Sequence, residues 1–132
     1  MGDAAALAML IGQLGYDAGA NDVTERLAAM AAEGRVVLVA ELDGAVVGCL
    51  STSAMRVLHR PAPVGRISMM VVDEALRSRG IGAALVHAVE GALAAEGCYM
   101  IEVISHQRRT EAHRFYERLG YDRTSVRLAK EL

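Results

Sequence analysis

The sequence predicts a mixed α/β (α+β) fold, in which two helices and a hairpin precede a strand–helix–strand–helix–strand series. Three observations predict it. Apolar residues recur at helical spacing near the start of the chain. Two β-branched or apolar runs flank Asp43-Gly44, which tolerates the positive φ of a hairpin turn. Glycines follow the later periodic segments, as at helix ends. The length of 132 residues predicts a single domain over residues 1–132.

The first two helices are expected to end at glycines. The first carries leucines at helical spacing and ends at Gly15, and the second ends at Gly34. We expect the second helix to begin at Asn21 or Asp22, since either can cap it. Glu25 lies three residues after Asp22, as in a capping box.

The remaining elements follow from changes of period and from turn residues. A last strand is expected because Val126, Leu128 and Leu132 are interspersed with charged residues. In chain order, the predicted elements are strands over 36–40, 45–50 and 67–72, a helix over 80–96, a strand over 99–104, a helix over 109–119 and a strand over 124–132.

Composition excludes several classes of function. The net charge of −2, from 14 basic and 16 acidic residues, gives no basic face for general nucleic-acid binding. No apolar run approaches the length of a membrane span, and the start of the chain lacks the basic region of a signal peptide. Cys49 and Cys98 form no CxxC pair, and the histidines share no ligand spacing, so neither a disulfide framework nor a metal site is expected. A cytoplasmic protein fits these features.

One turn has the chemistry of an anion site: Arg77-Ser78-Arg79-Gly80-Ile81-Gly82 comes between a predicted strand and a predicted helix. Amides at a helix start have no intrahelical acceptor, and glycines let an anion approach that backbone closely. Leu85 stands where a dinucleotide-binding pattern needs its third glycine, and Gly82-Ala83-Ala84 lacks the lysine of a P-loop. The turn therefore predicts a pyrophosphate site, with a solvated turn bearing two surface arginines as the alternative.

This turn and a later helix carry a family resemblance. Arg77, Gly80 and Gly82 match the pattern (Arg/Gln)-x-x-Gly-x-(Gly/Ala) after a strand, and the segment around Phe115 and Tyr116 matches a later helix of the same family. The two motifs, in this order and spacing, resemble the GNAT superfamily of N-acetyltransferases. The resemblance implies that the protein moves an acetyl group from acetyl-CoA to a primary amine of a small molecule or a protein by direct attack.

The resemblance also implies the arrangement of the sheet. Members of this family have a mixed, mostly antiparallel sheet with a splayed parallel strand pair and helices on both faces. They usually begin with a strand before the first helix, whereas this chain enters a helix almost at once. The first edge strand is therefore expected to be missing. The Val36–Ala40 strand would then have an exposed edge, which favours pairing with a second copy in a homodimer.

Roles for particular residues follow from the resemblance. Tyr116 matches the family's general acid, because a neutral phenol can donate a proton to the departing thiolate; the alternative is that Tyr116 packs beside Phe115. Donor-binding positions are expected on the strand for the pantetheine (Met70, Val71, Val72) and in the turn for the pyrophosphate (Arg77, Ser78, Arg79, Gly80, Ile81, Gly82).

The catalytic base is less well defined by the resemblance. Many relatives carry a glutamate on the strand where this chain has Ser68 and Met69. Glu102 resembles the base of some N-terminal acetyltransferases, with a water chain, or a carboxylate merely paired with an arginine, as alternatives. The missing strand carboxylate keeps a non-catalytic acyl-CoA-binding module as a second function.

Two further basic segments each have two interpretations. Arg108 and Arg109 either approach the donor phosphates or form a solvated helix end, with the solvated end preferred. The basic segment Met55–Arg60 either faces an acidic acceptor or is a solvated loop, again with the loop preferred.

Overall fold

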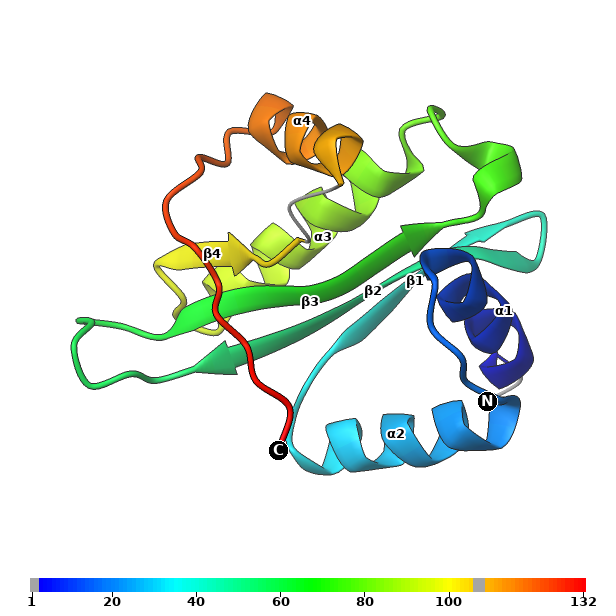
Figure 1. Ribbon diagram of the computed structural model, residues 1–132, viewed down its shortest axis with the longest axis horizontal. Coiled ribbons are helices and arrows are strands. Elements are labelled where there is room, and N and C mark those ends of the chain that lie inside the picture. Colours follow the sequence, from blue (N-terminus) through cyan, green and yellow to red (C-terminus); the bar gives the residue numbers. More distant parts are fainter. Residues whose placement is uncertain (1–2, 106–108) are drawn as a thin grey trace. The chain divides into compact units, whose positions relative to one another are not determined.

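The computed structural model describes residues 3–105 and 109–132. The chain divides into two compact units, Met1–Glu102 and Val103–Leu132. A four-stranded sheet in the order β1-β2-β3-β4 lies in the first unit, except for Val103, the last residue of β4 (Figure 1). The elements are α1 (Ala4–Leu14), α2 (Ala20–Ala32), β1 (Val37–Leu42), β2 (Ala45–Met55), β3 (Val64–Val72), η1 (Glu74–Leu76), α3 (Ile81–Ala95), β4 (Met100–Val103) and α4 (Thr110–Arg118).

The first two helices end as predicted, but the second begins earlier. Gly15 ends α1 in the left-handed conformation, with φ of 107°. Helix α2 begins at Ala20 behind the N-cap residue Gly19. The prediction of a start at Asn21 or Asp22 was therefore wrong, because Asp22 acts from inside the first turn: its Oδ2 accepts the Gly19 amide at 2.9 Å.

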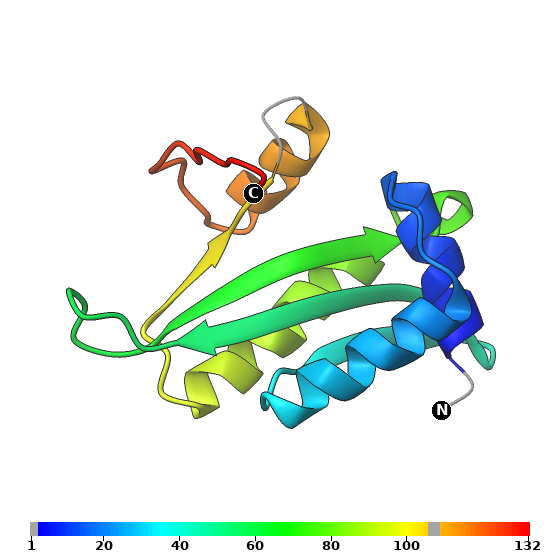
Figure 2. The ribbon, with the colours of Figure 1, turned by 60° about the horizontal axis from the view of Figure 1, so that its bottom comes forward.

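The predicted hairpin is confirmed as β1 and β2, joined at Asp43 and Gly44 with φ of 52° and 81°. These strands are antiparallel, and β2 pairs antiparallel with β3. The sheet is mixed, because β4 runs parallel to β3. Figure 2 shows β4 diverging from β3 along its length. Helices lie on both faces, as the family resemblance implies. In the described residues no strand precedes α1, the departure from the family that the sequence predicted.

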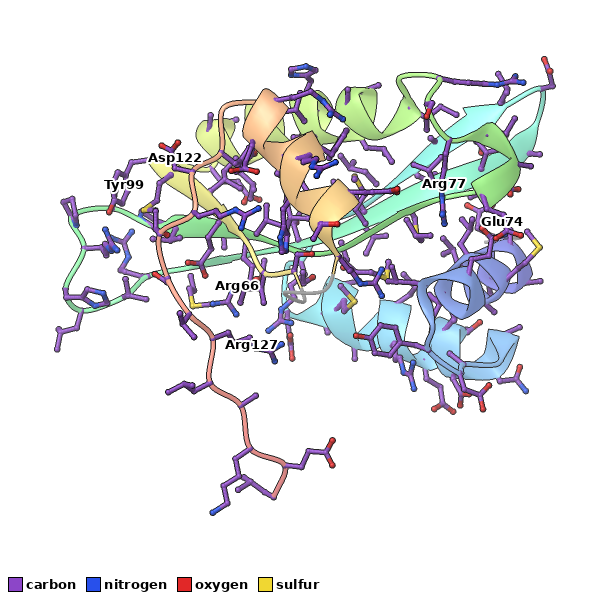
Figure 3. All side chains as sticks on the ribbon, turned by 45° about the horizontal axis from the view of Figure 1, so that its top comes forward. Arg66, Glu74, Arg77, Tyr99, Asp122 and Arg127 are labelled. Atoms are coloured by element: carbon purple, nitrogen blue, oxygen red, sulfur yellow. The ribbon has the colours of Figure 1, made fainter. Side chains whose placement is uncertain are left out.

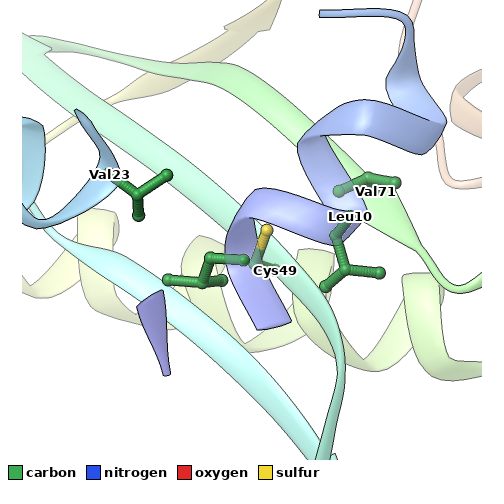
Figure 4. Packing of buried hydrophobic residues seen from close by; sticks show 5 residues of the cluster. Leu10, Val23, Cys49 and Val71 are labelled. Carbon is green, nitrogen blue, oxygen red and sulfur yellow. The ribbon is translucent and has the colours of Figure 1, made fainter. Parts of the chain in front are cut away.

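One face of the sheet is covered at one end by α1 and α2. Leu7 and Leu10 from α1 and Val23 from α2 pack with Cys49 of β2 and Val71 of β3 (Figure 4). Leu10 and Cys49 are at most 1% exposed. This cluster packs α1 against β3, the strand that precedes the glycine-containing turn.

Helix α3 packs against the other face. Its buried residues follow one side of the helix, and Leu93 meets β3 at Gly65. A Cβ atom at Gly65 would lie only 2.7 Å from Leu93 Cδ1. The glycine is therefore required for this close helix–strand contact. The buried side chains of α3 are Leu85, Val86, Val89 and Leu93.

The predicted strand over 124–132 was wrong. No strand is assigned there, and Val126 and Leu128 are 87% and 92% exposed. Alternating apolar residues form a strand only when their backbone groups find a neighbouring strand, and none pairs with this segment in the described part of the chain. Within the described residues, no helix combines the length and apolar character needed to cross a membrane.

Candidate active site

The turn between β3 and α3 is held by its own side chains and by α1. Asp73 caps the short helix η1, since its Oδ1 accepts the Ala75 amide at 3.1 Å. Gln13 of α1 reaches the same turn: its Oε1 accepts the Glu74 amide at 2.9 Å, and its Nε2 lies 3.5 Å from Asp73 Oδ1. Figure 3 shows Glu74 beside α1. Helix α1 therefore positions the start of the glycine-containing segment.

The backbone of this segment turns sharply before α3 begins. Ser78 and Gly80 have φ of 68° and 80°, in the left-handed region. The hydrogen bond from the Ala84 amide to the Gly80 carbonyl, at 3.0 Å, starts the intrahelical series. The amides of Ile81 and Gly82 precede it, so helix geometry supplies them with no acceptor. They are available to an anion at the positive end of the helix dipole.

The surroundings of these amides are open and basic. No atom lies within 4 Å of the position that a Cβ would take at Gly80. Residues 77–80 are all exposed, and they include Arg77 and Arg79. Arg77 donates from Nε to the Val72 carbonyl at 3.2 Å, which holds its side chain beside the end of β3 (Figure 3). A pyrophosphate could therefore reach the backbone with guanidinium groups nearby.

Strand β3 carries a bulge just before the predicted pantetheine-binding positions. Ser51 pairs with Met69 and Thr52 with Ile67, so Ser68 is the extra residue. Beyond the bulge, Val71 faces the α1 cluster, while Met70 and Val72 are half-buried. Because β4 has four residues and β3 has nine, much of the β3 edge lacks a β4 partner. Such an edge can offer backbone groups to a ligand.

Glu102 lies on β4 and is paired with Arg66 of β3. Arg66 Nη2 and Nε lie 2.6 and 2.8 Å from Glu102 Oε1, so both contacts use the same carboxylate oxygen. The two side chains are 34% and 40% exposed. The structure therefore shows the alternative interpretation of Glu102, a carboxylate paired with an arginine. Its role as the catalytic base stays a prediction. Sequence reasoning missed Arg66, although a charged residue inside the otherwise uncharged β3 was the available signal.

A cavity of about 190 Å³ lies beside this ion pair, within the first unit. It is built from the end of β2, the following loop, the start of β3 and Glu102 of β4. The sequence identified part of this lining, as the basic segment Met55–Arg60 and as the candidate base Glu102. The lining residues are Met55, Val57, His59, Arg60, Val64, Arg66 and Glu102.

Tyr116 belongs to the second unit and is buried in α4, 8% exposed. Its ring makes edge-to-face contacts with Phe115 and Tyr121, at centroid distances of 5.1 and 5.7 Å. Burial raises the pKa of the Tyr116 phenol to about 12, because desolvation disfavours the phenolate. The phenol is thus neutral at physiological pH, as a proton donor must be. The packing alternative is also realised, and the two roles do not exclude each other.

The remaining predicted positions give no further site geometry. Arg109 directly precedes α4 and its carbonyl accepts the His113 amide at 3.1 Å, whereas Arg108 lies outside the described residues. Within residues 3–105 and 109–132, no three histidine, cysteine or acidic side chains are grouped so that they could share a metal ion.

Comparison with known proteins shows which protein family this chain belongs to. The description of the acetyltransferase (GNAT) family matches residues 9–121, a stretch that includes the glycine-containing turn and Tyr116. The chain belongs to this family, a class of acyl-group transferases.

The chain is also similar to individual members. It is 33% identical over 90 residues to an aminoalkylphosphonate N-acetyltransferase of Salmonella typhimurium, a match that covers 68% of this chain and 58% of that protein. Among solved structures, a Trypanosoma brucei acetyltransferase has a TM-score of 0.82 at 24% identity, covering 98% of this chain and 93% of the other. Glucosamine-6-phosphate N-acetyltransferase of Arabidopsis thaliana has a TM-score of 0.84 at 22% identity, covering 96% and 89%. At these identities the two structures support the fold alone.

Proposed function

We propose that this protein transfers the acetyl group of acetyl-CoA to a primary amine of a small molecule or a protein. Membership of the acetyltransferase family supports the reaction class. The observation that carries the donor assignment is the start of α3, where the chain presents amides without intrahelical acceptors beside Arg77 and Arg79. The two cysteines are free, which agrees with a reducing compartment such as the cytoplasm.

The donor is proposed to lie along β3 and across the turn. Its pyrophosphate would accept hydrogen bonds from the backbone of 77–82, and its pantetheine would pair with the backbone of Met70–Val72, beyond the Ser68 bulge. The chain's own contribution here is to hold the thioester carbonyl in place, which lowers the entropic part of the barrier.

The chemistry requires three proton movements. The neutral amine attacks the carbonyl carbon, a C–N bond forms, the C–S bond breaks and the thiolate leaves. An alkylammonium with pKa about 10.4 must first lose a proton, which costs roughly 4.6 kcal/mol at pH 7. A base such as Glu102 or a water chain would accept that proton, and Tyr116 would donate one to the departing sulfur. The nitrogen carries a second surplus proton once the C–N bond has formed, and the release of this proton would return Tyr116 to the neutral phenol.

A second function is favoured by one specific observation. On the strand where the family resemblance implies a glutamate, this chain has Ser68 and Met69, and Glu102 is paired with Arg66. A protein with no free base near the acceptor would bind acyl-CoA without turning it over. The alternative is therefore a non-catalytic acyl-CoA-binding module.

The donor assignment is tested by Gly82→Trp. We expect this bulky side chain at the start of α3 to weaken acetyl-CoA binding at least tenfold, because it would block access to the amides. Gly91→Trp, on an exposed part of the same helix, is the matched control and should leave the calorimetric affinity unchanged. Unaltered affinity in Gly82→Trp would contradict the donor site.

The catalytic role is tested by Tyr116→Phe. Loss of a general acid is expected to lower kcat by about 100-fold or more, while acetyl-CoA affinity stays within about twofold. Tyr16→Phe, at an exposed position (65%), is the control. Aminoalkylphosphonates, the acceptors in the name of the Salmonella relative, are the first amines to assay. Normal turnover in Tyr116→Phe rejects the acid role, and an absence of turnover with every amine favours the binding module.

A further inference from the structure

The face of the sheet that α1 and α2 cover at one end is polar at its other end. Cys49 and Val71 pair at the covered end. Farther along the same face, Ser51 lies opposite Met69, and Ser53 lies opposite Arg66. The bulged Ser68 also turns to this face, since its hydroxyl lies 2.8 Å from Ser51 Oγ. Hydroxyl and charged groups on a sheet face indicate a surface adapted to a polar ligand rather than to a packed helix.

The cavity opens at this polar end and carries an excess of basic groups. Arg60, Arg66 and His59 line it together with one carboxylate, that of Glu102. Arg60 is oriented by a hydrogen bond from its Nη1 to the Tyr99 hydroxyl, at 3.1 Å. Two guanidinium groups thus line the cavity together with a single carboxylate. The cavity is therefore suited to a ligand that brings at least one negative charge.

The ion pair offers complementary groups to a ligand with both charges. Both contacts from Arg66 fall on Glu102 Oε1, so the second carboxylate oxygen can accept a hydrogen bond from an ammonium group. The pair is partly exposed, so a ligand can approach it. A diamine would place a second positive charge near two arginines, which repel it. A dicarboxylate would place a negative charge near the carboxylate of Glu102, which repels it as well.

The size of the cavity limits the ligand further. Its volume of about 190 Å³ is below the range of roughly 300–1,000 Å³ that holds drug-sized ligands. A small molecule of a few carbon atoms with two polar ends fits such a space. A folded protein or a large antibiotic does not fit within it.

We infer that this cavity binds the acetyl acceptor, and that the acceptor is a small zwitterion: a primary amine directed to Glu102, with an anionic carboxylate, phosphonate or phosphate group directed to Arg60 and Arg66. This inference rests on the proposed acetyl transfer and names its substrate class. In this arrangement the Arg66–Glu102 pair orients the acceptor, because each of its two charged groups binds one end of the molecule.

The test compares amines with and without a second, anionic group. Propylamine, β-alanine and aminopropylphosphonate are assayed with acetyl-CoA and the full chain. The two zwitterions are expected to have kcat/KM values about tenfold or more above that of propylamine, because charged hydrogen bonds at a half-exposed site are worth about that factor. Equal values for all three amines would overturn the inference and leave the proposed function intact.

Variants locate the preference at the cavity. Arg60→Gln is expected to reduce the ratio of kcat/KM for zwitterion over propylamine by about tenfold, through a higher KM for the zwitterions. Arg66→Gln should reduce it at least as much. Arg56→Gln, from the same loop but outside the cavity lining, is the matched control with an unchanged ratio. Thermal unfolding checks each variant, and Arg60→Gln, at an exposed position, carries the test should Arg66→Gln fail to fold.

A binding measurement separates this inference from the reaction itself. β-Alanine and aminopropylphosphonate are titrated by calorimetry into CoA-saturated wild type and Arg60→Gln. Binding that Arg60→Gln weakens supports the zwitterion site even if no amine is acetylated, in which case the proposed function alone fails. No detectable binding together with no preference in turnover overturns the inference.

Discussion

Two buried side chains, Tyr116 and Cys49, titrate far from their ordinary ranges. Burial raises the pKa of Tyr116 to about 12 and that of Cys49 to about 11, because each anion would lose its hydration. For Tyr116 this has a functional meaning in the proposed reaction. The phenol stays protonated over the whole range in which an alkylamine becomes neutral, so raising the pH increases the supply of nucleophile without removing the acid.

The Tyr116 shift predicts how stability depends on pH. A phenol in the unfolded chain ionises near 10, and the folded one near 12. The contribution to the free energy of unfolding is therefore constant below pH 10 and falls by roughly 2–3 kcal/mol as the pH rises to 12. Urea unfolding at several pH values should show that Tyr116→Phe loses less stability over this window than wild type. Cys49 is present in both proteins, so the comparison isolates the phenol; equal losses would contradict the shift.

At the scale of single elements, glycines define where helices stop and where α3 can approach the sheet. Gly15 and Gly34 end α1 and α2 at positive φ, which the sequence predicted. Gly65 acts differently, since its φ is ordinary and its lack of a side chain makes room for Leu93. The sequence showed no sign of this contact, because Leu93 lies far along the chain. The bulge at Ser68 was missed for the same reason, since a bulge exists only relative to a partner strand.

Two alanine substitutions test the α3 contact. Gly65→Ala is expected to lower the free energy of unfolding by about 1–3 kcal/mol, because Leu93 is only 2% exposed and has little room to move. Gly91→Ala is the matched change on the exposed side of α3, where no atom lies within 4 Å of the added Cβ. It should raise stability by about 0.5–1 kcal/mol through helix propensity. Denaturant melts measure both, and a neutral Gly65→Ala would mean that the helix shifts freely.

At the scale of the whole molecule, strand β1 forms an edge of the sheet. Strand β1 is the first in the order β1-β2-β3-β4, so its outer edge has no strand partner from the described residues. Val39 and Leu42 on this strand are 37% and 43% exposed. Unpaired backbone groups beside exposed apolar side chains favour association with a second copy.

Light scattering over a range of concentrations tests this association. We expect a dimer at high concentration, with Val39→Lys shifting the equilibrium toward monomer because a charge at a strand edge opposes pairing. Leu58→Lys, at a fully exposed loop position, controls for the added charge. A wild-type protein that stays monomeric at the highest concentration would refute pairing through β1.

Local features of this protein were determined by the sequence alone. The hairpin at Asp43-Gly44, the glycine-terminated helices and the glycine-containing start of α3 depend on backbone preferences of neighbouring residues. Those preferences also made the family resemblance detectable. The order of α1 to α4 and β1 to β4 and the glycine-containing turn were thus predictable from the sequence.

Only the tertiary structure decided which distant side chains meet. The pairing of Arg66 with Glu102, the contact of Gln13 with Glu74 and the cavity beside Arg60 join residues 36 or more positions apart. The strand predicted over 124–132 was wrong for the same reason. Alternating apolar and charged residues form a strand only when a partner strand lies beside them. Backbone preferences act over a few residues, whereas charge pairing and sheet formation depend on what the fold brings close.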